Sequence, residues 1–132
     1  MTQAPPSARD RGQASVELAL LLPVVLLLLL AVLQVGLLAR DVVLVTHAAR
    51  EAARAAATDP RPSVARAAAL AASGLEPSRL TVTTTVRGRD PSTRRVRVEV
   101  AYRAPTAVPL VGAIVADRTI RTTATMRVEA PP

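Results

Sequence analysis

The chain has 132 residues, which leaves room for one small domain with an extension. Half of the residues are apolar, but Tyr102 is the single aromatic residue, so a core of large aromatic side chains is excluded. All 17 basic residues are Arg and the net charge is +7. The absence of Cys excludes disulfides, thiolate metal sites and a Cys nucleophile, and one His (His47) excludes a multi-histidine metal site. We expect no metal and no other cofactor.

The first fifteen residues, MTQAPPSARDRGQAS, are polar and carry two early prolines, which predicts a short disordered arm. Residues 18–39, LALLLPVVLLLLLAVLQVGLLA, follow without a charge. As a helix this run extends roughly 33 Å, close to the hydrocarbon core of a bilayer at about 30 Å. Gln34 is its only strongly polar residue, so it has no polar stripe. It is also longer than the apolar region of a cleaved secretory signal, and we predict an uncleaved membrane anchor.

Pro23 lies in the apolar run beyond the first helical turn, where a proline removes one backbone hydrogen bond. We expect it to kink or loosen the helix locally. Two interpretations stay open: simple tolerance of the break in lipid, or a flexible point used when the chain leaves the bilayer.

Residues 41–59, DVVLVTHAAREAARAAATD, contain strong helix formers and no Gly or Pro, so we expect the helix to run from about Ser15 to Ala57. Small residues recur every fourth position in two rows, Ala48, Ala52 and Ala56, and Ala49 and Ala53. Such rows let helices approach closely, although alanine is also a good helix former that simply faces the strands. The charged residues between them predict a solvated face with an ion pair between Glu51 and Arg54.

Asp59 and Pro60 predict an N-cap and a first helical residue for a second helix over residues 60–73, which ends at Gly74. From Leu80 the apolar period changes to two and predicts three half-buried strands, LTVTTTVR, RRVRVEVAYR and RTIRTTATMRVE. Residues 88–92 form the turn between the first two strands. The connection 105–116 is apolar for a loop and is expected to dock on the sheet or on a partner. Because three strands need a helical cover, the sequence predicts an antiparallel α+β fold.

The segment RGQASVEL precedes the apolar run and places Glu17 five residues after Gly12. This arrangement resembles the processing site of type IV prepilins. Together with ASVELALLLP, THAAREAARAAA and the late ATMRVE, it resembles the TadE-like family, pseudopilin-like proteins of tight-adherence (Flp) type IV pilus systems. The sequence departs from the family at Ala53, where Gly is frequent, and in lacking aromatic residues around the span.

The resemblance implies cleavage by a prepilin peptidase between Gly12 and Gln13, which makes residues 1–12 a leader. It further implies a transmembrane helix over residues 13–40, an N-terminus in the cytoplasm and a pilin-like extracytoplasmic head over residues 41–132. The implied partners are the prepilin peptidase, other pilin-like subunits, the pilus assembly platform and membrane lipid. Charge counting does not set the orientation, because arginines flank both ends of the span.

Glu17 has two interpretations. In the first helical turn its negative charge is favoured by the helix dipole. Once cleavage frees the Gln13 amine, Glu17 also gains a cationic partner in its own chain or in a neighbouring subunit, where it would set the stagger during assembly. The resemblance favours this second interpretation.

The aspartates are scattered, and the chain has no glycine-rich phosphate loop, G-x-S-x-G or H-E-x-x-H motif, so we expect no enzyme and no small-molecule substrate. Two alternatives to a pilus component remain. One is an unprocessed, signal-anchored envelope protein unrelated to pili. The other is a nucleic-acid-binding protein, which is disfavoured because stacking aromatics are missing and the head is tethered to a membrane. Its candidate phosphate contacts are Arg87, Arg89, Arg94, Arg95 and Arg97.

Overall fold

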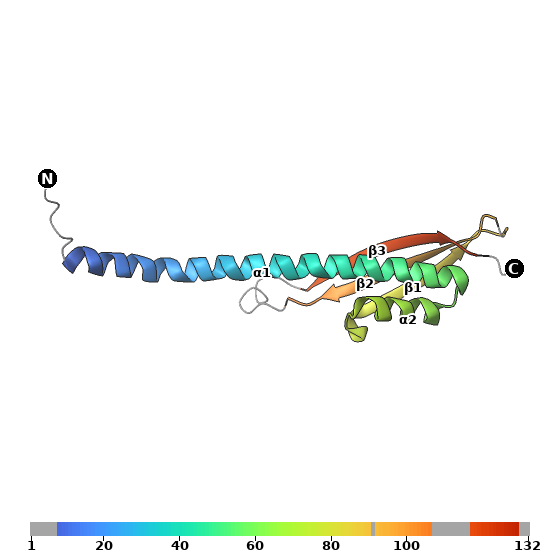
Figure 1. Cartoon of the computed structure of the whole chain (residues 1–132), viewed down its shortest axis with the longest axis horizontal. Coiled ribbons are helices and arrows are strands. Elements are labelled where there is room, and N and C mark those ends of the chain that lie inside the picture. The colour runs from blue at the N-terminus through green and yellow to red at the C-terminus, as the bar shows by residue number, and fades with distance from the viewer. Residues whose placement is uncertain (1–7, 91, 107–116, 130–132) are drawn as a thin grey trace.

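A computed structural model describes residues 8–90, 92–106 and 117–129 of the chain. Its elements are α1 (Ala8–Thr58), α2 (Pro62–Ser73), the 3-10 helix η1 (Pro77–Arg79), β1 (Leu80–Arg87), β2 (Arg95–Ala104) and β3 (Arg118–Arg127). The predicted α+β fold, with a long helix, a short second helix and a three-stranded antiparallel sheet, is confirmed. Figure 1 shows that the N-terminal part of α1 projects far beyond the head, while its C-terminal part lies along the sheet.

Helix α1 has 51 residues and extends roughly 75 Å. It begins at Ala8 and not near Ser15, so residues 8–14, which were expected to belong to the disordered arm, are helical. No proline follows Pro6 until Pro23, and Ala, Arg and Gln are good helix formers, so the helix continues through this stretch in spite of Gly12. The helix also continues through Pro23 without a break (Figure 1).

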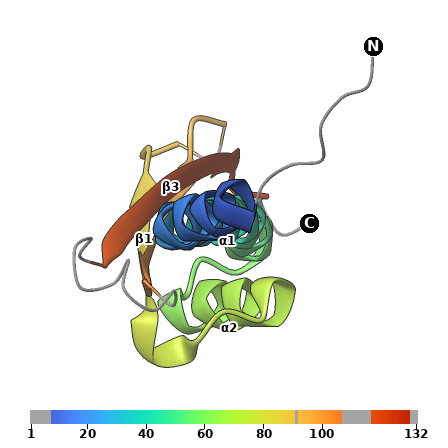
Figure 2. The same ribbon diagram turned by 90° about the vertical axis from the view of Figure 1, so that its left-hand side faces the viewer.

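The sheet has the order β1–β2–β3 with both pairs antiparallel. Helix α1 packs on β2 and β3, whereas α2 packs beside α1 and over β1. Figure 2, which views the molecule along α1, shows this arrangement of two helices beside one layer of strands. The predicted alternation is confirmed on β2, where Val96, Val98, Val100 and Tyr102 are buried and Arg95, Arg97 and Arg103 are exposed.

Small side chains build the core between the helices and the sheet. Alanines of α1 and α2 face valines of β2, so the helix backbones lie close to the strands, and each buried valine contributes about 1.5–3 kcal/mol. The buried apolar residues are Val45, Ala48, Ala49, Ala52, Ala53, Ala56, Ala57, Ala65, Ala69, Leu75, Leu80, Val96, Val98, Val100, Tyr102, Ala104 and Val128.

Helix α2 begins two residues later than the sequence predicts. Its N-cap is Arg61 in an extended conformation, and Pro62 rather than Pro60 occupies the first turn, because a residue before proline is disfavoured in the helical region. Asp59 instead accepts hydrogen bonds from the backbone N–H and the guanidinium of Arg61. The predicted C-terminus is correct: Gly74 has φ of 62° and donates its N–H to the Leu70 carbonyl at 3.2 Å.

The end of the head farthest from the projecting part of α1 is closed by turns and by backbone hydrogen bonds. Gly88 adopts φ of 102°, and the Arg94 N–H donates to the Asp90 carbonyl at 2.9 Å. After β3, the Glu129 N–H donates to the carbonyl of Ala57 at 2.9 Å and ties the chain to the end of α1. Most of the apolar connection 105–116 and Pro91 of the predicted turn lie outside the described residues.

Candidate functional site

The apolar run of α1 is exposed along almost its whole length. In the described part of the chain, α1 is the one helix long and apolar enough to cross a membrane, and none of its most apolar window is buried. Side chains such as Leu20, Leu28 and Val35 are 73%, 64% and 66% exposed. A soluble monomer rarely exposes so large an apolar patch. The structure is therefore compatible with single-pass membrane anchoring through residues 18–39.

Gln13 and Glu17 lie at the start of this surface, one helical turn apart on one face of α1. Together with Val16 and Leu20 they line a shallow groove, and both side chains are exposed. Residues four apart on a helix are neighbours, so a charge at Gln13 would lie beside the Glu17 carboxylate. The structure thus brings together the candidate cleavage point and the candidate assembly residue.

Gln34 faces the junction between the apolar run and the head. Its Oε1 atom is buried and has no hydrogen-bond partner among the described residues. It borders a pocket of about 290 Å³ between α1 and the ends of β2 and β3. The other lining residues are Ala31, Val35, Leu38, Asp41, Ala104, Pro105, Thr106 and Arg118. Gln34, the one strongly polar residue of the apolar run, therefore marks where the exposed part of α1 meets the head.

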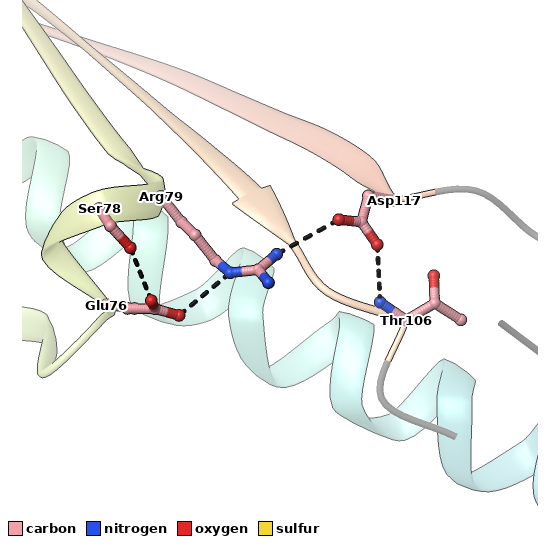
Figure 3. Close-up of polar contacts among 5 residues, drawn as sticks. All are labelled: Glu76, Ser78, Arg79, Thr106 and Asp117. Carbon is pink, nitrogen blue, oxygen red and sulfur yellow. Dashed lines mark hydrogen bonds and ion pairs between the residues drawn. The ribbon is translucent and has the colours of Figure 1, made fainter. Parts of the chain in front are cut away.

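An ionic cluster lies at the same end of the head (Figure 3). Asp117 accepts a hydrogen bond from the Thr106 backbone N–H at 3.1 Å and from Arg79 Nη1 at 3.2 Å. Arg79 Nε also donates to Glu76 Oε2 at 3.0 Å, and Ser78 Oγ donates to Glu76 Oε1 at 2.6 Å. The Ser78 hydrogen bond, aided by the Arg79 charge, lowers the pKa of Glu76. This cluster links η1 to the ends of β2 and β3.

The alanine rows of α1 pack against other elements of the same chain. Each of the five alanines singled out above is fully buried in the core, so the rows pack α1 onto the head. Arg50 and Arg54 are exposed as expected, but Glu51 forms no ion pair with Arg54 in the described part of the chain, and that prediction is wrong. His47 is exposed.

Sequence reasoning missed the ionic cluster and the junction pocket. Glu76, Ser78 and Arg79 look like ordinary loop residues, and Asp117 lies 38 positions from its arginine partner. No local spacing signals such a contact. Across the described ranges, no three or more His, Cys, Asp or Glu side chains form a group that could hold a metal ion.

These features define a class: a protein with one long helix that is a candidate membrane anchor in its first half and packs into a small α+β head in its second. The family described as TadE-like protein matches residues 12–54, from the candidate cleavage point to the alanine rows. This match confirms the predicted resemblance over residues 12–54. No curated protein and no solved structure gives a significant match to the chain.

Proposed function

We propose that the chain is a minor pilin-like structural or assembly component of a tight-adherence pilus or a related secretion apparatus. The observation that carries this proposal is the continuity of α1, which is exposed over the apolar run and buried over the alanine rows without an interruption. A single helix of this kind couples the position of the head directly to that of the membrane segment. The chain catalyses nothing itself in this proposal.

Processing by a prepilin peptidase is the second part of the proposal. The bond between Gly12 and Gln13 lies inside α1, so cleavage there removes the leader and leaves Gln13 as the first residue of the helix. Its new α-amine carries a positive charge at neutral pH. The exposed Glu17 carboxylate, one turn away, then pairs with this amine in its own chain or in a neighbouring subunit.

The orientation follows from the proposed processing. The N-terminus lies in the cytoplasm, the apolar run crosses the inner membrane once, and the head is extracytoplasmic. Other pilin-like subunits contact the exposed apolar surface of α1, while the assembly platform acts on the membrane segment. A reporter fused after Pro132 tests this orientation. Activity of a fused reporter that functions only in the cytoplasm would contradict it.

Mass spectrometry of the mature chain, isolated from membranes of its own cells, tests the proposal most directly. We expect a chain that begins at Gln13, and a Gly12→Leu variant that keeps its leader. The matched control is Ala14→Leu, which enlarges a neighbouring side chain without altering the Gly. A wild-type chain that begins at Met1 or Thr2 in cells with an active prepilin peptidase would favour the alternative, an unprocessed envelope anchor unrelated to pili.

A further inference from the structure

Three arginines lie side by side across the sheet at the end of the head farthest from the membrane anchor. Arg95 of β2 pairs in register with Arg87 of β1 and with Arg127 of β3. All three are exposed. They lie on the outer face of the sheet, because the next register position, which includes the buried Val96, faces the helices. We call these three residues the arginine row.

The fold itself does not require this arrangement. Like charges directly opposite one another across strands are destabilising, and the neighbouring outer-face positions of β1 and β3, Thr85 and Thr125, are uncharged. Arg121 is the other outer-face arginine of β3. Among the described residues, no ion pair joins the row to a carboxylate. Arg97 extends the positive surface along β2, and the outer-face Glu99 lies further on, in register with Thr83 and Thr123. Asp90 and Glu129 are the nearby acidic residues in the sequence.

We propose that the arginine row binds an acidic surface of a partner protein, a cluster of Asp and Glu side chains. The guanidinium group presents a planar fork of donors that matches a carboxylate in a bidentate manner. The three arginines share one register position on adjacent strands, so several such forks lie side by side on one sheet. The choice of a protein partner rests on the proposed assembly function, in which the head lies among other subunits.

Other occupants fit the row less well. A second copy of this chain carries the same net charge of +7 and is repelled. Single-stranded nucleic acid usually stacks its bases on aromatic side chains, but Tyr102 is buried on the opposite face of the sheet. Double-stranded DNA is not expected where the proposed function places the head, outside the cytoplasm. Duplex DNA nevertheless offers phosphates, so it is included in the test.

The test measures binding of a fluorescent polyglutamate peptide to the full chain in nanodiscs of uncharged lipid at physiological salt. We expect the triple variant Arg87→Gln, Arg95→Gln, Arg127→Gln to bind the peptide about tenfold more weakly than the wild type. The control triple variant, Arg50→Gln, Arg103→Gln, Arg121→Gln, removes the same charge from α1 and from the opposite end of the outer face of β2 and β3. It is expected to keep most of the affinity. Circular dichroism of both variants checks that the head is folded.

Three outcomes would overturn the proposal. The first is a wild-type chain that does not bind the peptide or that loses no affinity in the row variant. The second is an equal loss in both variants, which would mean that net charge alone drives binding. The third is tighter binding of duplex DNA than of the peptide through the row, which would assign the surface to nucleic acid. Because the assay contains no peptidase and no other subunit, a failure of the proposed pilus function leaves its result unchanged.

Discussion

The backbone N–H of Thr106 donates a hydrogen bond of 3.1 Å to Asp117 Oδ1 and so joins the end of β2 to the start of β3. The second oxygen of Asp117 accepts from Arg79, so one carboxylate fastens three parts of the head (Figure 3). This contact lies beside the pocket that the head forms with the last turns of the apolar run. It therefore ties the ends of β2 and β3 together beside the place where the sheet meets the helix.

Asp117→Ala removes both interactions, and we expect a loss of about 1 kcal/mol in the free energy of unfolding. Asp117→Asn keeps an acceptor for the Thr106 N–H and loses mainly the ion pair, so its effect is expected to be smaller. Thermal unfolding of the full chain in detergent, followed by circular dichroism, measures both. Equal stability of the Ala variant and the wild type would show that the contact does not stabilise the head.

Gly88→Ala is expected to destabilise the head by about 1–3 kcal/mol. Gly88 has φ of 102°, and an added Cβ would lie 2.6 Å from the Thr93 carbonyl oxygen. Gly74→Ala is a matched comparison, because Gly74 also has a positive φ but has open space around the added Cβ. The unfolding temperature should fall more for Gly88→Ala than for Gly74→Ala, and the reverse order would contradict the turn geometry.

Ala52→Leu tests whether the alanine rows pack inside the chain. Ala52 is fully buried, so a larger side chain overpacks the core and is expected to cost about 1–3 kcal/mol or more. The control is Ala67→Leu on α2, where the side chain is exposed and has room. Chemical denaturation of the two variants in detergent should separate them clearly. Equal stability of the Ala52→Leu and Ala67→Leu variants would contradict the close packing of α1 on the sheet.

Tyr102 reports on the core through its titration. Burial is the main cause that raises the pKa of its hydroxyl above the ordinary 10.0, and the negative charge of Asp41 adds to it. Because the pKa is higher in the folded state, the stability from the neutral hydroxyl is present below about pH 10 and is lost as the pH rises through the folded pKa. The chain has no Trp, so tyrosinate absorbance follows this one residue.

We expect the absorbance midpoint of Tyr102 to lie above that of the chain unfolded in denaturant. Tyr102→Phe should remove the corresponding loss of stability at alkaline pH. A midpoint equal to that of the unfolded chain would mean that Tyr102 is not buried between the sheet and the helices.

Glu17→Gln tests the charge pairing in the proposed function. The variant should still insert into the membrane and still be cleaved, because the apolar run and Gly12 are unchanged. We expect weaker association with other pilin-like subunits, measured by crosslinking in membranes, since the Gln13 amine loses its anionic partner. Glu51→Gln, a carboxylate of α1 within the head, is the control. Unchanged crosslinking of the Glu17 variant would contradict the charge pairing and favour the other interpretation, in which the helix dipole favours a negative charge at Glu17.

Local patterns in the sequence were sufficient to predict the membrane-compatible run, the two helices and the three strands. The apolar stretch has the length of a bilayer, and the period of two on β2 corresponds to its buried and exposed faces. The ends of elements were less predictable. The start of α1 at Ala8 and of α2 at Pro62 depended on helix propagation and on the proline that follows Arg61.

The sequence by itself determined the membrane-compatible apolar run, the motif that begins at Gly12 and the alternation of the strands, because each depends on residues a few positions apart. Only the tertiary structure decided that the alanine rows are buried, that Asp117 binds Arg79, and that Arg87, Arg95 and Arg127 form a row. These relationships join residues distant in the chain. They are set by strand register and by the packing of α1 on the sheet, which no local spacing encodes.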